Sequence, residues 1–514
     1  MRAVLVVVAS VATIVCFLPR GKAHELMPPW VLLLIAIVIP PLGIVLLWTR
    51  ARAGIFRKLL GSLALVLLSV AQLHFFFGLK AELDGTGARP IFSFEAPESH
   101  YKELERSRTE QGVAAELAPP VDVVAPPPMG RDSPRFRGPR MDGRYEAAEI
   151  LTEWPADGLP LLWKQPVGGG YASFVVTGGR AFTIEQRRDQ EVVAAYDLKT
   201  GREIWTHGWT AEFRETLGGD GPRATPTLDE DRVYALGASG ELKVLEAASG
   251  EVLWERNILE DAGADNLQWG MSASPLIVDE KVVVLPGGPN GSSLIAYDKR
   301  TGATIWKSLD DEQAYTSPIL VTLSGERQIL VVGANRAMGL AVDDGSLLWD
   351  YPWVTNMGIN VAQPLILDQS RVFLSAGYGH GAAVVEVTQG ESGFSARPVW
   401  SNTRMKNKFA SSVLHQGYIY GLDEAILACV DASTGDLKWK GGRYGYGQLL
   451  LAADHLIVLT ERGEIVLVKA TPEKHEELAM FPAIEGKTWN HPAMADGVLL
   501  VRNANEMAAF RIAP

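Results

Sequence analysis

Aromatic, basic and amide side chains recur just before predicted short strands in the chain beyond residue 160, and they are the residues best suited to hold a ligand. Aromatic faces can grip an anionic ligand or a peptide, and Arg and Lys supply positive charge beside them. We therefore predict a ligand- or partner-binding surface where these positions converge. Its members are Tyr171, Arg223, Trp269, Tyr315, Asn360, Asn407, Lys408, Tyr446, Trp489 and Asn490.

Other kinds of site find little support in the sequence. Cys16 and Cys429 are isolated, so neither a disulfide framework nor a cysteine metal site is expected. The 9 histidines show no metal-ligand spacing, and His380 and His491 are expected at polar loop positions or at the mouth of the fold. The glycines at 168–170 are not completed by Lys-Ser/Thr, so they do not predict a phosphate loop. We predict no catalytic residue and no metal site.

A repeated hairpin must position the predicted binding residues. One clear copy runs from Ala195 to Trp205, with an Asp and a Gly that suit a tight turn and a Trp in the second strand. Such tryptophans recur at spacings of 42, 49, 52, 43, 51 and 39 residues. We expect them to wedge between neighbouring units as structural docking residues. They are Trp163, Trp205, Trp254, Trp306, Trp349, Trp400 and Trp439.

The repeat predicts an all-β fold. A second signature ending in proline, as in Ala224-Thr225-Pro226, comes before most of these tryptophans and precedes apolar runs, so each unit holds about four short strands. Four-stranded units with a period of about 40–50 residues predict a β-propeller, because one sheet buries both faces only between neighbours. Six intervals between tryptophans and two further units predict eight antiparallel blades, with residues 161–163 completing the last one.

The N-terminal region is apolar and predicts a membrane anchor. Its apolar runs cover about 3–19, 28–48 and 58–78, and the last two approach the roughly 20 residues that a bilayer span needs. The first run is either a signal peptide or a retained helix. Basic residues within 50–58 place that loop in the cytoplasm by the positive-inside rule. We predict two or three transmembrane helices within 1–79, integral to a bacterial inner membrane, with the rest of the chain in the periplasm.

Two further regions follow the predicted anchor. Residues 80–158 are predicted to form an extracytoplasmic connector, partly helical over 98–116 and Pro-rich after it, and 159–514 form the propeller. Residues 1–80 hold eight basic residues and one acid, which leaves 40 basic and 59 acidic residues, a net charge of −19, for the remainder. An acidic domain of this kind argues against nucleic acid as a partner.

The repeated units resemble the tryptophan-docking motif of the pyrroloquinoline quinone (PQQ) repeat family, Ala-x-Asp-x-x-x-Gly-x-x-x-Trp in outline, over about 159–514. The runs at 135–139 and 486–492 are similar to a membrane-anchored bacterial subgroup described as PQQ-binding-like. The family contains quinoprotein dehydrogenases, which use PQQ with calcium. It also contains BamB, a periplasmic scaffold for outer-membrane assembly that has no cofactor. The resemblance therefore implies the fold and leaves both functions open.

The dehydrogenase interpretation lacks several parts that the resemblance implies. Adjacent cysteines beside the quinone are missing from this chain. Calcium needs oxygen ligands that lie close together. The turn of the repeat already explains Asp343 and Asp344, and Asp220 is expected as a loop residue, so these acids do not predict a calcium site. The predicted anchor favours an enzyme, since membrane glucose dehydrogenases share that layout. We predict a BamB-like scaffold that binds envelope proteins or peptides without catalysis or cofactor. The alternative is a membrane dehydrogenase that uses PQQ with calcium, oxidises alcohols or sugars and passes electrons to quinone.

Overall fold

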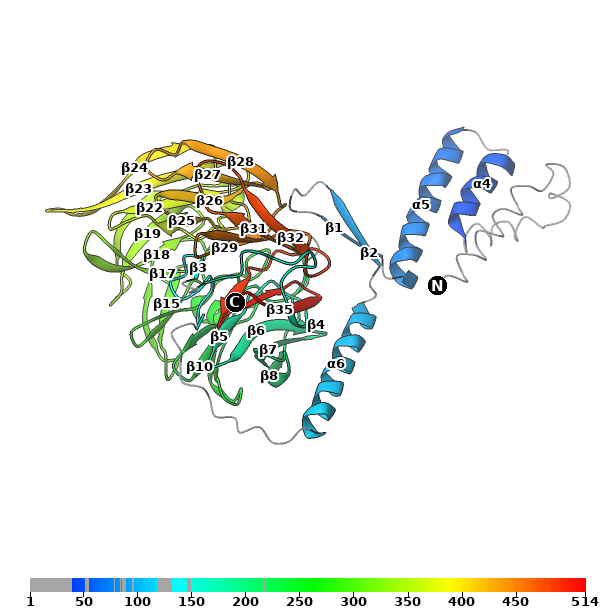
Figure 1. Cartoon of the computed structure of the whole chain (residues 1–514), viewed down its shortest axis with the longest axis horizontal. Helices are drawn as coiled ribbons and strands as arrows, with labels where there is room; N and C mark the ends of the chain where they lie inside the picture. The colour runs from blue at the N-terminus through cyan, green and yellow to red at the C-terminus, as the bar shows by residue number, and fades with distance from the viewer. Residues whose placement is uncertain are drawn as a thin grey trace. The chain divides into compact units, whose positions relative to one another are not determined.

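The computed structural model describes residues 39–50, 55–77, 79–83, 85, 89–94, 97–117, 132–145, 149–215 and 218–514. The chain divides into two compact units, one of Met1–Glu82 with Pro90–His100 and one of Leu83–Arg89 with Tyr101–Pro514. The described part of the first unit is mainly helical, and the second is a β-propeller (Figure 1).

The first unit contains two apolar helices, α4 (Pro40–Arg50) and α5 (Ile55–Phe77). They pack against each other, and Trp48 Nε1 donates to Ser62 Oγ at 2.9 Å. Within the described residues, Ile55–Leu73 is the one stretch long and apolar enough to cross a membrane. The predicted run at 3–19 and most of the run at 28–48 lie outside the described residues. Strands β1 (Leu79–Leu83) and β2 (Pro90–Phe94) follow and pair with each other.

The second unit begins with most of helix α6 (Pro97–Leu117) and strand β3 (Arg144–Tyr145), and eight sheets follow. The first four blades take their strands in chain order. Blade 1 contains β5 (Val175–Thr177), β6 (Arg180–Arg187), β7 (Gln190–Asp197) and β8 (Glu203–Thr210). Blade 2 contains β9 (Thr227–Asp229), β10 (Arg232–Leu236), β11 (Glu241–Glu246) and β12 (Val252–Asn257). Blade 3 contains β13 (Leu276–Val278), β14 (Lys281–Val284), β15 (Leu294–Asp298) and β16 (Thr304–Ser308). Blade 4 contains β17 (Ile319–Leu323), β18 (Glu326–Val332), β19 (Arg336–Ala341) and β20 (Leu347–Pro352).

The remaining blades include the closure of the ring. Blade 5 contains β21 (Leu365–Ile366), β22 (Arg371–Ala376), β23 (Gly381–Gly390) and β24 (Gly393–Asn402). Blade 6 contains β25 (Val413–His415), β26 (Tyr418–Asp423), β27 (Ile426–Asp431) and β28 (Leu437–Arg443). Blade 7 contains β29 (Gln448–Ala452), β30 (His455–Leu459), β31 (Glu464–Lys469) and β32 (Glu477–Pro482), with β3 added in parallel to β29. Blade 8 contains β33 (Ala493–Ala495), β34 (Val498–Arg502), β35 (Glu506–Arg511) and β4 (Leu161–Pro166).

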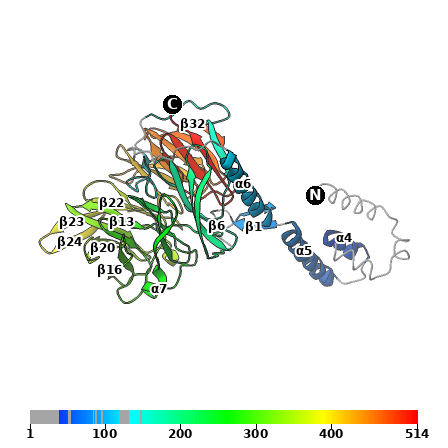
Figure 2. The same cartoon turned by 90° about the horizontal axis from the view of Figure 1, so that it is seen from below.

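The predicted eight-bladed propeller and its closure are confirmed, because β4 from the start of the ring pairs antiparallel with β35 at its end. The first strands of several neighbouring blades contact one another, β5 with β9, β9 with β13, β13 with β17 and β25 with β29, so they line the central axis. Figure 2 shows the same blades after a quarter turn, with helix α7 (Ile258–Ala262), which follows β12 in the chain, at the lower edge of the view. We call the end of the axis where these first strands begin the mouth.

The turn glycines explain how neighbouring blades fit together. A Cβ on Gly201 would lie 2.6 Å from the ring of Trp163, and one on Gly250 would lie 2.5 Å from the ring of Trp205. The same relation joins Gly302 with Trp254, Gly345 with Trp306 and Gly435 with Trp400. These five turn glycines therefore each provide the seat for the tryptophan of the preceding blade, besides adopting the positive φ of the turn. Trp163 Nε1 also donates to Leu198 O at 2.9 Å.

Every outer strand pair carries a register shift, and in seven of the eight blades it lies beside the tryptophan. In blade 1, Trp205 pairs with Ala195 and Glu203 pairs with Tyr196, so Ile204 is an extra residue. All eight blades have such an irregularity between their third and fourth strands. A bulge of this kind bends and twists the strand locally, and it occurs here where the large ring must turn towards the next blade.

The segment 132–145 crosses the axis of the propeller opposite the mouth. Ser133 bridges to Val176 in β5 of blade 1, and β3 pairs with β29 of blade 7. Between them, the buried Arg137 donates to Ser412 O at 2.7 Å. The predicted helical part of the connector is α6, whereas most of its Pro-rich part lies outside the described residues. The segment closes the lower end of the central channel, so any cavity at the mouth has a floor.

Candidate functional site

A cavity of about 420 Å³ lies at the mouth of the propeller, among the loops that precede the first strands of the blades. This volume is within the range of small-ligand sites, roughly 300–1,000 Å³. Six of the predicted binding residues line it: Tyr171, Arg223, Trp269, Tyr315, Lys408 and Trp489. The repeat brings them together because equivalent positions of successive blades meet around the axis. Whether they bind a ligand stays a prediction.

The other predicted residues lie beside or beneath this cavity. Tyr446 is buried next to it, and its hydroxyl donates to Glu424 Oε2 at 3.1 Å. Asn490 is buried and donates to Ala172 O at 2.9 Å, which ties the loop of blade 8 to that of blade 1. Asn407 donates to Leu422 O at 3.0 Å, and Asn360 donates to Gly333 O at 2.9 Å. These three amides are short enough to reach loop carbonyls, so they shape the mouth from below.

Aromatic rings make up most of the cavity wall. Trp489 packs against Phe409 with centroids 4.5 Å apart and against Tyr171 at 5.6 Å. On another side, Trp269 and Tyr315 lie 5.8 Å apart. Such pairs hold one another in place and expose flat apolar faces to a ligand.

Three cations lie over these faces. The Arg223 guanidinium is 5.5 Å from the centroid of Tyr171, and it donates to Gly219 O at 2.6 Å; burial lowers its pKa. Lys408 Nζ is 4.6 Å from the ring of Tyr378, and Lys487 Nζ is 4.4 Å from the ring of Trp489. Cation–π contacts of this kind strengthen when they are desolvated. The cavity therefore combines apolar faces with positive charge, which suits an anionic ligand or a peptide carbonyl.

The floor of the cavity comes from a segment that the repeat does not contain. Phe136 lines the cavity and packs edge-on against His491, with centroids 5.6 Å apart. Burial, together with the positive charge of Arg137, lowers the pKa of His491 to about 3. This imidazole is therefore neutral at neutral pH. The sequence did not predict Phe136 as a lining residue. It lies outside the repeat, about 35 residues before Tyr171, and it reaches the cavity only through the way segment 132–145 packs.

Further lining residues were also missed. Tyr378 and Phe409 contribute rings beside Lys408, and Met357 lies at the rim with 69% of its side chain exposed. Phe409 directly follows a predicted binding residue, so its position in the sequence was an available signal. Tyr378 follows β22 rather than preceding a first strand, so the pattern that we used could not find it.

The acidic residues near the mouth bind protein groups. Glu461 Oε1 accepts from Trp489 Nε1 at 2.9 Å, and Asp220 Oδ1 accepts from the backbone amide of Glu215 at 3.1 Å. Within the described residues, no group of three or more His, Cys, Asp or Glu is placed to hold a metal ion. The residues around the cavity thus do not fit the oxygen-rich ligand set that calcium requires, and we derive no step through a quinone. The prediction that no cofactor is bound stays a prediction.

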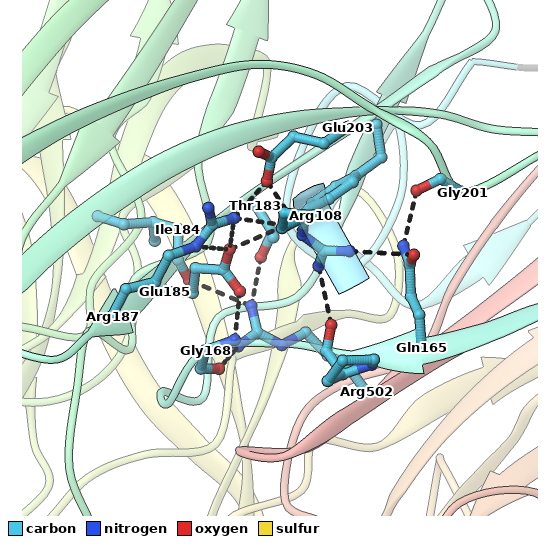
Figure 3. Close-up of polar contacts among 12 residues, drawn as sticks. Arg108, Gln165, Gly168, Thr183, Ile184, Glu185, Arg187, Gly201, Glu203 and Arg502 are labelled. Atoms are coloured by element: carbon cyan, nitrogen blue, oxygen red, sulfur yellow. Dashed lines mark hydrogen bonds and ion pairs between the residues drawn. The ribbon is translucent and has the colours of Figure 1, made fainter. Parts of the chain in front are cut away.

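A second buried charged cluster lies where the ring closes, and Figure 3 shows its contacts. We call Arg108, Glu185, Arg187, Glu203 and Arg502 the seam cluster. Glu185 Oε1 accepts from Arg187 Nε at 2.8 Å, and Glu203 Oε2 pairs with Arg108 Nε at 3.2 Å. The fully buried Arg502 donates to carbonyl and hydroxyl oxygens, including Gly168 O at 2.9 Å. Burial by itself would raise the pKa of Glu185, but Arg187, Arg502 and Arg108 outweigh it and lower the pKa to about 2.

Helix α6 reaches the closing strand through the same cluster. Arg108 donates to Gln165 Oε1 at 3.0 Å and to Pro166 O at 2.8 Å, both on β4, and its guanidinium lies 5.2 Å from the ring of Tyr196. Gln165 Nε2 in turn donates to Gly201 O at 2.6 Å in the first blade. Every member of the cluster is bound by other protein groups, so we assign it to holding the ring closed.

Comparison with known proteins identifies the family that the repeat resembles. A family model described as outer membrane protein assembly factor BamB matches residues 188–441. The chain is a PQQ-repeat β-propeller. It is 29% identical over 176 residues to BamB of Shewanella oneidensis, a match that covers 32% of this chain and 41% of that protein. It is 22% identical over 315 residues to BamB of Bordetella pertussis, covering 58% of this chain and 72% of the relative.

Enzymes are also among the relatives of this PQQ-repeat propeller. The quinohemoprotein alcohol dehydrogenase ADH-IIG of Pseudomonas putida is 25% identical over 220 residues, which cover 40% of this chain and 29% of the enzyme. Among solved structures, BamB from Moraxella catarrhalis superposes with a TM-score of 0.50 at 15% identity, covering 69% of this chain and 97% of that one. The designed protein Ika8 gives 0.52 at 11% identity, covering 69% and 100%. Likeness at this level of identity establishes the fold alone.

Proposed function

We propose that this protein is a BamB-like, non-enzymatic scaffold of the bacterial envelope and that its mouth cavity binds polypeptide segments of partner proteins. The observation that carries the proposal is the composition of the cavity, in which aromatic faces and cations surround a space of about 420 Å³. The nearby Glu461 accepts hydrogen bonds from N–H groups. Rings bind apolar side chains, cations bind peptide carbonyls, and carboxylates bind peptide amides.

A membrane anchor completes the proposal. Helix α5 spans 23 residues and exposes large apolar side chains along its length, among them Leu60, Leu67 and Val70. In water such a surface would be unfavourable, whereas a lipid bilayer would cover it. Basic residues precede and begin this helix, so the positive-inside rule places its start in the cytoplasm and the propeller in the periplasm. A periplasmic reporter enzyme fused after Pro514 should be active, and activity of a cytoplasmic reporter there would contradict this topology.

Photo-crosslinking tests the binding site in cells. A photoreactive amino acid at Met357, on the rim of the cavity, should capture envelope proteins that mass spectrometry can identify. The same group at Leu253, an exposed position on outer strand β12, is the matched control. Capture from Met357 should fall at least tenfold when Lys408→Met is added. Equal capture from both positions, or capture that Lys408→Met leaves unchanged, would remove the binding site from the mouth.

A PQQ-dependent dehydrogenase is the second candidate, favoured by the similarity to the Pseudomonas putida enzyme. The purified chain should be mixed with PQQ and calcium, followed by absorbance of the quinone and reduction of a dye with alcohols and sugars. The scaffold proposal expects no turnover. Tight quinone binding with substrate-dependent dye reduction would replace it by the enzyme.

A further inference from the structure

One residue from outside the blades already occupies the edge of the mouth cavity. Gly85 is buried and belongs to the propeller unit, although it lies between β1 and β2 in the sequence. Its amide donates to Glu461 Oε1 at 2.7 Å, and its carbonyl accepts from Lys408 Nζ at 2.5 Å. Both polar groups of one backbone residue are therefore bound by oppositely charged side chains, one from the hairpin between β30 and β31 and one from the connection between β24 and β25.

The space around this residue admits only glycine. A Cβ built on Gly85 would lie 2.1 Å from one ring carbon of Tyr446 and 2.2 Å from another, far inside van der Waals contact. Tyr446 has little freedom to move away, since it is buried, its ring packs 5.9 Å from Phe409, and its hydroxyl is bound by Glu424. Any side chain at this position would have to displace the ring or leave the site.

The groups that hold Gly85 are themselves fixed by the mouth. Glu461 Oε1 also accepts from Trp489 Nε1, and Lys408 Nζ lies 5.1 Å from the ring of Tyr446. Charged partners in a partly desolvated site make stronger hydrogen bonds than neutral ones. The carboxylate, the ammonium group and the ring of Tyr446 thus form a receptor for a glycine backbone, which we call the glycine receptor.

We propose that the glycine receptor is the partner-recognition site of the mouth and that Gly85 is an intrachain ligand occupying it. A partner polypeptide that presents a glycine in a turn would use the same carboxylate and ammonium group and would have to displace Gly85. The residues on either side of that glycine would reach the cavity behind it, where aromatic faces and Arg223 favour apolar or acidic side chains. This inference rests on the proposed function, because it names the kind of segment that the scaffold binds.

The tether makes this competition measurable. A ligand on the same chain acts at a raised effective concentration, because its binding is intramolecular. An external peptide with the same contacts should bind poorly while Gly85 is in place and at least tenfold more tightly once Gly85 is excluded. Gly85→Leu excludes it by collision with Tyr446, and Gly112→Leu is a matched control, because no atom lies within 4 Å of a Cβ at Gly112.

The probe is a synthetic peptide of residues 79–94 carrying a fluorophore, titrated into the full chain in detergent. We expect at least tenfold tighter binding to the Gly85→Leu chain than to the wild type or to Gly112→Leu, and loss of binding when the peptide itself carries Gly85→Leu. Equal binding to all three chains would overturn the proposal. So would equal binding of the two peptides to the Gly85→Leu chain.

Amide hydrogen exchange gives a measurement that needs no variant at Gly85. In the wild-type chain the Gly85 amide should exchange at least tenfold more slowly than in Glu461→Ala, with the blades equally protected in both chains. An unprotected Gly85 amide in the wild type would overturn the inference and leave the envelope crosslinks from Met357 unaffected. Conversely, a protected Gly85 without any crosslinks would contradict the proposed function alone.

Discussion

The mouth cavity and the seam cluster are both built around buried cations, and they use them in opposite ways. In the seam cluster, Arg108 and Arg187 pair with carboxylates, and Arg502 binds oxygens of the neighbouring blade. At the mouth, Arg223 and Lys487 lie over aromatic rings and bind loop carbonyls. Paired charges fix one geometry, whereas cations over rings leave flat faces that a ligand can use. The difference separates a region that holds the ring from one that can bind a partner.

The largest expected effect comes from removing the closing strand. Deletion of residues 159–165 should expose the edge of β35 and break the seam, because β4 supplies the fourth strand of blade 8 and carries Gln165. We expect the cooperative thermal transition to disappear and protease sensitivity to rise. Moving residues 159–166 behind Pro514 through a short Gly-Ser turn should restore both. An unchanged melting temperature in the deletion would show that the ring does not depend on β4.

Replacing the central acid of the seam tests its role without removing a strand. Glu185→Gln removes the buried carboxylate that faces both Arg187 and Arg502 and leaves Glu203 as the acid paired with Arg187, which should lower the free energy of unfolding by about 3–5 kcal/mol at pH 7. The pKa of Glu185 is lowered to about 2, so its stabilisation is present above about pH 4.5 and is lost as the pH falls towards 2. Urea midpoints of both chains across this range measure the difference.

The matched control for this acid is Glu110 on α6, which forms an exposed pair with Arg106. Glu110→Gln should leave the urea midpoint unchanged, since exposed pairs contribute little. If Glu185→Gln is as stable as Glu110→Gln at pH 7, the seam cluster does not hold the closure.

A neighbouring acid whose pKa is raised rather than lowered should behave in the opposite way. Glu191 is fully buried in the same blade, and burial and the nearby Glu241 raise its pKa to about 7, although the Ala238 amide partly offsets them. The native state then binds more protons than the unfolded state, so stability should fall as the pH rises from about 4.5 to 7, by about 3 kcal/mol in total.

Glu191→Gln should remove most of this dependence. Oε2 of Glu191 and Oε2 of Glu241 have no hydrogen-bond partner among the described residues. The side-chain amide of the variant could donate to Glu241 at any pH, whereas an ionised Glu191 has no proton to donate. Urea unfolding of wild type and variant at pH 5 and pH 8 checks the sign. A wild type that gains stability over that range would contradict the interpretation of this pair.

The smallest effect on stability is expected at the mouth. Lys408→Met should change the free energy of unfolding by less than about 1 kcal/mol, since its contacts to aromatic rings and to the Gly85 carbonyl lie at a partly exposed surface. The crosslinks from Met357 should nevertheless be lost. Lys199→Met, on an exposed outer turn, is the control for both measurements. A loss of stability as large as that of Glu185→Gln would make the mouth a structural region like the seam.

Much of the fold and part of the site could be predicted from the sequence. Repetition made the blades visible, and it placed Tyr171 and Trp489 correctly because each residue precedes the first strand of a blade. The same logic could not find Phe136 or Gly85, since both come from segments outside the repeat and reach the mouth only through long-range contacts. Asn407 and Asn490 were predicted to face a ligand, yet they are buried and bind loop carbonyls, because only packing decides where a short amide points.

From the amino-acid sequence alone, the eight blades, the strand that closes them and the recurring turn glycines and docking tryptophans could be predicted. These follow from local turn chemistry repeated at a constant interval, and each copy supports the interpretation of the others. Only the tertiary structure decided which cations pair with acids and which lie over rings, that Phe136 closes the floor of the cavity, and that Gly85 enters its edge. Those outcomes depend on contacts between residues up to 376 positions apart, which leave no periodic trace in the chain.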